Sequence, residues 1–260
     1  MLGPGSGLTR QQLSITDAAA VEASIAAARP RVVFNCAAYN AVDRAESEPD
    51  RAFAVNADGP RIVAVACARL GVQLVHFSTN FVFDGTQDRP YVETDTPSPQ
   101  GVYAASKLEG ERRVLEVMPR ALVMRTAAVF GGRRGDSFPE KILERARRGE
   151  PLRVVGDQRV NPTCTKDLAA AAIEQVEAGA TGLLHAAAAG CCAWDEFARA
   201  VLAEHGLEVE VTTISSVDLA APARRPGNGC LESVRMAALR PWQDGLREWA
   251  AGREPGLQDP

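Results

Sequence analysis

Short apolar runs alternate with longer alanine-rich stretches through the first half of the chain, and this alternation constrains the fold most strongly. The runs lack the alternating polar positions of a strand with one wet face, so they are typical of strands buried on both faces. They lie at residues 31–36, 72–77 and 121–125. Helices are expected at about 17–28, 51–70 and 104–117, the first with Thr16 or Asp17 as its N-cap. This order predicts right-handed βαβ units and an α/β fold with a doubly wound parallel sheet.

Beyond about residue 131 the pattern loosens, which predicts a second, smaller lobe of mixed structure. We expect loops at 131–135 and 222–229, both rich in Gly and Arg, and helices near 137–148, 166–178 and 193–206. The first domain would then comprise residues 1–130 with part of 155–190, and the lobe residues 131–155 and 190–260.

Composition and charge argue against several classes of function. The 260 residues are 46% hydrophobic and 24% charged, and the net charge of -4 lacks the basic excess of a nucleic-acid-binding protein. No apolar run approaches the ~20 residues of a membrane-spanning helix, and no signal peptide opens the chain. A cytoplasmic protein with neither a nucleic acid nor a membrane as partner is expected.

The six cysteines and three histidines have no spacing that indicates a metal site. Cys191 and Cys192 are adjacent, which is neither a zinc-ligand nor a CxxC redox spacing, and the other cysteines are scattered. We therefore expect reduced, mostly buried thiols and no metal.

A phenol and an ammonium, those of Tyr103 and Lys107, lie four residues apart within a predicted helix, and that spacing puts both on one face. A nearby cation lowers the pKa of a phenol, so Tyr103 can donate a proton to a nascent alkoxide while Lys107 holds a ribose hydroxyl. The alternative is a surface Tyr and Lys at coincidental spacing.

Polar side chains follow the second predicted strand, at the edge where open α/β sheets bind ligands: Ser78, Thr79 and Asn80. The Thr79 hydroxyl can hydrogen-bond a substrate carbonyl and stabilise the developing oxyanion, whereas capping of the strand end is the alternative. After the preceding strand, Ala37 and Ala38 are small enough for a flat cofactor to approach the backbone, although close helix–sheet packing explains them equally well.

Read in order, these motifs resemble the dTDP-4-dehydrorhamnose reductase family, a branch of the extended short-chain dehydrogenases. The resemblance covers nearly the whole chain, from Leu13 to Trp249. It is carried by NCAAYNAVDRAE at 35–46, STNFVFDG at 78–85, YAASK at 103–107, Arg125-Thr126, Asp157-Gln158, Pro162-Thr163, Trp194 and ARRP at 223–226. Together these motifs are far more specific than a lone YxxxK.

The resemblance implies a Rossmann-type fold and NAD(P)H-dependent reduction of the 4-keto group of dTDP-4-dehydrorhamnose, giving dTDP-L-rhamnose or a related deoxysugar. It implies that Tyr103 donates the proton, Lys107 holds the nicotinamide ribose and Thr79 assists at the carbonyl. Further cofactor-binding residues are expected to be Ala37, Ala38, Tyr39, Asn40, Ser78, Arg10 and Ile15. Substrate-binding residues are expected to be Thr79, Asn80, Tyr103, Ala128, Arg224 and Arg225, the two arginines being solvated surface residues in the alternative. Relatives are often dimers, so a homodimer is expected.

The opening of the chain departs from the family pattern, because no strand precedes Gly3, Gly5 and Gly7 and no helix follows them. These glycines are therefore not expected to form the phosphate-binding loop, as if the first βα unit, about 25 residues, were absent. Such a chain is expected to bind its cofactor weakly. Thr9, followed by Arg10, replaces an acidic residue that binds the adenosine ribose, which tilts the expected preference from NADH towards NADPH.

Two smaller departures affect the substrate side. Asn80 replaces the family's usual Asp, and Ala128 stands where a Trp often packs against the sugar, so a different 4-keto-6-deoxy sugar is an alternative substrate. The main alternative function is a non-catalytic protein that resembles the regulatory β subunit of methionine adenosyltransferase. A third is an epimerase or dehydratase of the same superfamily, which would need an acidic residue at position 80.

Overall fold

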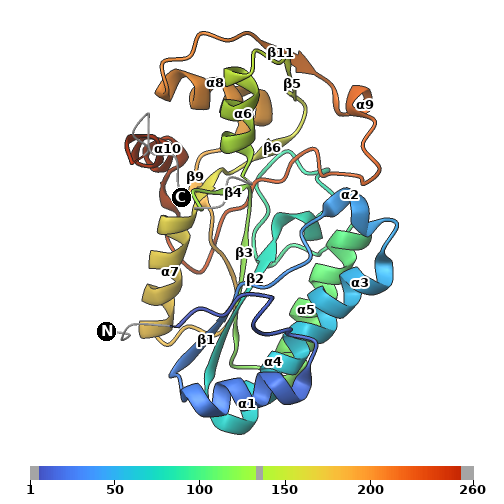
Figure 1. Cartoon of the computed structure of the whole chain (residues 1–260), viewed down its shortest axis with the longest axis vertical. Helices are drawn as coiled ribbons and strands as arrows, with labels where there is room; N and C mark the ends of the chain where they lie inside the picture. The colour runs from blue at the N-terminus through green and yellow to red at the C-terminus, as the bar shows by residue number, and fades with distance from the viewer. Residues whose placement is uncertain (1–5, 133–136, 253–260) are drawn as a thin grey trace.

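A parallel four-stranded sheet forms the centre of the computed structural model, which describes residues 6–132 and 137–252 (Figure 1). Its strand order is β1-β2-β3-β8, and each neighbouring pair is parallel. The strands are β1 (Val32–Asn35), β2 (Gln73–Thr79), β3 (Leu122–Thr126) and β8 (Gly182–His185). The expected α/β class with a parallel sheet is thus confirmed. Gly3, Gly5 and most of the loop expected at 131–135 lie outside the described residues.

Helices cover both faces of this sheet, which explains the uninterrupted apolar runs in the strands. Leu74 and Val123 pack on the face covered by α1 (Ala18–Ala28), α4 (Gly59–Leu70) and α5 (Val102–Val117). Their neighbours Val75, Leu122 and Met124 point the other way, towards α7 (Thr165–Glu177). Because successive side chains in a strand alternate between faces, the central strand β3 is buried on both faces, whereas the outer strands β1 and β8 are partly exposed.

Most of the helices follow the expectation from sequence. Asp17 caps α1, since its side chain accepts a hydrogen bond from the Ala20 N–H. The helix expected at 51–70 is wrong as one element. It is divided into α3 (Pro49–Phe53), the π-helical turn η1 (Ala54–Asp58) and α4.

This division has a local cause. Pro60 has no N–H to donate to the carbonyl of Asn56, four residues earlier. Helix α5 packs against that carbonyl through Gly110, where a Cβ atom would lie 2.0 Å from the Asn56 oxygen. Asn56 is itself buried, with its side-chain amide bonded to the Tyr39 carbonyl and the Ser106 hydroxyl.

The remaining elements gather in the upper half of Figure 1 around one aromatic core, which includes Phe130, Phe197, Trp242 and Trp249. Four short strand pairs frame it: β5 (Leu152–Val155) with β11 (Val211–Ile214), β4 (Val129–Phe130) with β7 (Thr163–Cys164), β6 (Arg159–Val160) with β10 (Cys192–Ala193), and β9 (Ala188–Ala189) with β12 (Leu239–Pro241). Its helices are α6 (Phe138–Arg147), α8 (Trp194–Glu204) and α10 (Trp242–Ala251), whereas the short helix α9 (Ser216–Leu219) buries no residue.

One expectation about the cysteines is wrong. Cys191 and Cys230 form a disulfide across 39 residues, with their Cα atoms 6.1 Å apart. Cys67, Cys164 and Cys192 are buried free thiols, whereas the free thiol of Cys36 is exposed. Adjacent cysteines gave no spacing signal for this pairing, because the partner is brought close only by the fold.

Among the described residues, none of the helices is both long and apolar enough to cross a membrane.

Candidate active site

Helix α5 presents Tyr103 and Lys107 on one face, as their spacing predicts, and both side chains are buried in the sheet domain. The helix begins beside the short helix α2 (Val42–Ala45), where the Glu46 carboxylate accepts a hydrogen bond from the Val102 N–H. An acidic group there satisfies an otherwise unpaired amide and interacts favourably with the helix dipole. The start of α5, and with it Tyr103, is therefore fixed in place.

The Tyr103 phenol lies near the Thr79 side chain at the end of β2. Burial raises the pKa of this phenol, and the neighbouring Thr79 side chain opposes that rise. The ring also packs edge-on against Phe81, with 5.6 Å between ring centroids. The structure thus brings together two of the three residues expected to act at a substrate carbonyl.

Lys107 donates a hydrogen bond from Nζ to the Phe77 carbonyl, two residues before Thr79, at 2.7 Å. Burial lowers the pKa of this ammonium to about 8, while the negative charge of Glu111 opposes the shift. A group with that pKa remains mostly protonated at pH 7. Burial, followed by the Lys107 charge, lowers the pKa of the neighbouring His76, so His76 stays neutral.

Asn80, expected at the substrate, is almost fully buried, and its amide serves two other contacts. Its Nδ2 donates to the Gly229 carbonyl at 2.9 Å, and its Oδ1 accepts from the Thr79 hydroxyl at 3.3 Å. A Cβ atom at position 229 would meet the Asn80 nitrogen, so any larger residue there would displace the Asn80 amide. Asn80 therefore ties the end of β2 to a segment about 150 residues further along the chain.

Small and partly open residues follow β1, at the same edge of the sheet. Ala37 and Asn40 are exposed and Ala38 is half-buried, so the backbone there is open to a flat ligand. The Tyr39 ring instead packs in the cluster that contains Tyr103, and its hydroxyl donates to Glu48.

The other expected residues lie in different surroundings. Arg10 is exposed, and Ile15 packs against Gly59 at the start of α4. Arg224 is exposed, whereas Arg225 forms a bidentate ion pair with Asp43 at 2.8 and 3.0 Å. That bond lowers the pKa of Asp43.

Ala128 has a left-handed backbone with φ of 44° just beyond β3. Such a conformation is uncommon for a residue other than glycine, and strained positions of this kind cluster at binding sites.

Sequence reasoning assigned no role to Glu111 or to Arg125, which form a buried ion pair beneath the site. The spacing could have indicated Glu111, because this residue lies four positions after Lys107 and therefore on the same face of α5. Arg125 is harder to anticipate, because the apolar run around it predicts a buried strand but does not indicate a partner for a buried charge.

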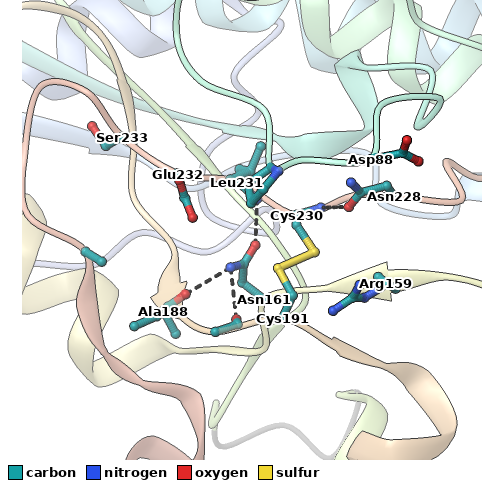
Figure 2. A pocket seen from close by; sticks show the side chains of 14 residues that line it. Asp88, Arg159, Asn161, Ala188, Cys191, Asn228, Cys230, Leu231, Glu232 and Ser233 are labelled. Atoms are coloured by element: carbon teal, nitrogen blue, oxygen red, sulfur yellow. Dashed lines mark hydrogen bonds between the residues drawn. A yellow bond between two sulfur atoms is a disulfide. The ribbon is translucent and has the colours of Figure 1, made fainter.

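A cavity of about 380 Å³ lies in another place, around the disulfide (Figure 2). Asp88, Arg159, Asn228 and Glu232 are among the polar residues that line it. None of the residues expected at the cofactor or substrate lines this cavity.

Comparison with known proteins adds independent information. The family model described as RmlD substrate binding domain matches residues 5–253. The dTDP-4-dehydrorhamnose reductase of Mycobacterium tuberculosis strain H37Rv is 43% identical over 261 residues, covering 97% of this chain and 84% of that protein. A Streptomyces antibioticus protein named probable dTDP-4,6-dihydroxy-2-methyloxan-3-one 4-ketoreductase is 39% identical over 256 residues, covering 94% of this chain and 85% of that protein.

Solved structures agree with these relatives. The crystal structure of the dTDP-4-dehydrorhamnose reductase of Bacillus anthracis strain Ames, in complex with NADP, matches with a TM-score of 0.91 at 31% identity. The match covers 95% of this chain and 89% of that one.

Proposed function

The chain belongs to the RmlD substrate-binding-domain family of dTDP-4-dehydrorhamnose reductases, and on that premise we propose that it reduces the 4-keto group of a dTDP-4-dehydro-6-deoxy sugar with NAD(P)H. The observation that carries this proposal is that Tyr103 and Lys107 are buried on one face of α5 beside the end of β2, where Lys107 bonds the Phe77 carbonyl, two residues before Thr79. These residues provide a proton donor, a carbonyl-binding hydroxyl and a cation at the carboxyl edge of a parallel sheet.

The residues at this edge fit the nicotinamide end of the cofactor. Ala37 and Ala38 leave the backbone open, and Tyr39 and Asn40 continue the same segment. When bound, NAD(P)H supplies the hydride. We propose that the exposed Arg10 and also Ile15 contact the adenosine end of the cofactor. An Arg at that position favours the 2'-phosphate of NADPH.

In the proposed reaction, hydride adds to C4 of the sugar and the C4 oxygen takes a proton, so that a ketone becomes an alcohol. Tyr103 gives up the phenol proton, and Thr79 hydrogen-bonds the same oxygen as negative charge develops on it. Lys107 then stabilises the phenolate and is expected to hold a ribose hydroxyl. Solvent is expected to return a proton to Tyr103 after each turnover.

Other residues proposed to bind the sugar nucleotide lie beyond β3 and in the segment that contains Arg224 and Arg225. We propose that Arg224 meets the pyrophosphate, because it is exposed, whereas Arg225 would first have to leave Asp43. Ala128 would border the sugar. Because one relative is named a 4-ketoreductase of a different dTDP sugar, a sugar other than dTDP-4-dehydrorhamnose is an alternative substrate.

We further propose that the protein acts in the cytoplasm and assembles as a homodimer. We also propose that each chain is divided into two domains. The first domain comprises residues 1–130 with part of 155–190, and the lobe residues 131–155 and 190–260. We propose that Ser78 lies next to the cofactor and Asn80 next to the substrate, each with its side chain held by another protein group.

Spectrophotometric NADPH and NADH oxidation with dTDP-4-dehydrorhamnose tests the proposal. Tyr103→Phe should reduce kcat by at least about 100-fold, because the proton donor is lost. Tyr91→Phe is a matched control, since Tyr91 is a buried phenol outside the site, and it should keep most of the activity. If the wild-type protein neither turns over nor binds either cofactor, the regulatory alternative replaces this proposal.

A further inference from the structure

Glu111 is a buried carboxylate that the reaction above does not use. It is 3% exposed and lies on α5 one turn beyond Lys107. Its Oε2 accepts a hydrogen bond from Arg125 at 2.6 Å, and its Oε1 accepts bonds from Arg125 at 2.9 Å and from the Ser78 hydroxyl at 2.5 Å. Three donors thus hold a charge that is costly to bury.

The partners of Glu111 come from two adjacent strands. Ser78 on β2 lies directly opposite Arg125 on β3 in the parallel register. The carboxylate therefore joins α5 to both strands at the edge of the sheet where the proposed chemistry occurs. Arg125 is 2% exposed and its guanidinium also lies over the Phe83 ring, 5.1 Å from the centroid, so it is fixed as well.

Ser78 stands between the two backbone positions on which the site depends. The residue before it, Phe77, provides the carbonyl that accepts the Lys107 hydrogen bond, and the residue after it is Thr79. A shift of β2 relative to α5 would therefore change both the Lys107 contact and the Tyr103 contact. The bond from Ser78 to Glu111 opposes that shift.

A buried ion pair is in general weak evidence for stability, because the cost of desolvating two charges offsets their attraction. An apolar pair would pack α5 on the sheet equally well. Hydrogen bonds with fixed direction provide what apolar packing lacks, which is a unique register between helix and strand.

We propose that Glu111 is a positioning residue that, through Arg125 and Ser78, locks the end of β2 against α5 and so holds Thr79 at Tyr103 and the Phe77 carbonyl at Lys107. This inference rests on the proposed reductase function. Both Glu111 oxygens are engaged by protein groups, so the proposed role acts through those groups. Its charge also stabilises the Lys107 ammonium, since it opposes the effect of burial on the pKa of Lys107.

The experiment compares Glu111→Gln with Asp195→Asn. Asp195 is the control, because it is a buried carboxylate in the other lobe that pairs with Arg199 at 2.6 Å and accepts the Thr213 hydroxyl at 2.7 Å, although Arg199 is more exposed than Arg125. Both variants should lose thermal stability. Only Glu111→Gln should lower kcat, by about 100-fold, with KM for the sugar changed less than about threefold, because a misplaced catalytic group costs about that much.

Two further measurements keep the test decisive if Glu111→Gln folds poorly. Ser78→Ala leaves the Glu111–Arg125 pair intact and should lower kcat by about tenfold. Amide hydrogen exchange should become about tenfold faster in peptides that contain residues 77–80 of either variant, and remain unchanged there in Asp195→Asn.

The positioning role is overturned if Glu111→Gln keeps wild-type kcat, or if exchange at residues 77–80 changes no more than in the control. A wild-type protein without turnover would refute the proposed function instead. The exchange measurement needs no substrate, so it would still decide whether Glu111 locks β2.

Discussion

The disulfide between Cys191 and Cys230 should contribute strongly to stability, and Cys191→Ala tests how much. In the chain-entropy model, a cross-link across 39 residues removes about 13 cal/mol/K from the unfolded state, or about 3.9 kcal/mol at 25 °C. Unfolding 260 residues has an entropy of roughly 0.55 kcal/mol/K, so Tm should fall by about 7 °C.

The assay is thermal unfolding of protein purified without reductant, measured with and without dithiothreitol. Reduction of the wild type should lower Tm by about 7 °C, and Cys191→Ala should show the lower Tm under both conditions. Cys192→Ala is the control, because this neighbouring thiol is free, and it should keep its response to reductant. A wild-type Tm that ignores reductant, or a Cys191→Ala protein that still responds to it, would refute the reasoning.

Three other expectations follow from the structure. Gly110→Ala should destabilise the fold by about 3 kcal/mol in urea unfolding, because the new Cβ meets the Asn56 carbonyl; an unchanged midpoint would contradict the packing. Because Lys107 has a lowered pKa of about 8 and works as the cation, kcat/KM should fall as pH rises through about 8, and a profile flat to pH 10 would exclude this role. Asp43→Asn should cost under about 1 kcal/mol in thermal unfolding, since its ion pair with Arg225 is partly exposed; a larger loss would indicate a structural role.

Elements that are decided by local pattern were predictable from the sequence. The three first strands, the Asp17 cap and the common helix face of Tyr103 and Lys107 all depend on neighbours within a few residues. Periodicity and capping chemistry are read over that range. The position of Thr79 at the end of a strand was predictable in the same way, and the carboxyl ends of strands in a parallel sheet are where ligands bind.

What the sequence did not reveal depends on contacts between distant segments. The pairing of Cys191 with Cys230, and of Arg225 with Asp43, follows from the fold and from no spacing rule. Two-residue strands such as β4 are too short for any periodicity to appear. Asn80 illustrates the same limit, since its bond to Gly229 spans 149 residues.

Three successive turns of α5 carry Tyr103, Lys107 and Glu111, and this has an evolutionary consequence. Their spacing is set by the helix itself, so drift in the loops beyond residue 131 can reshape the surroundings of a sugar without separating the proton donor from its cation. Recombination near that point would exchange the lobe together with α7 and β8 of the sheet domain, and would inherit these three residues as a unit. The same junction is therefore a natural crossover for chimeric reductases that keep one proton-transfer helix and acquire new sugar preferences.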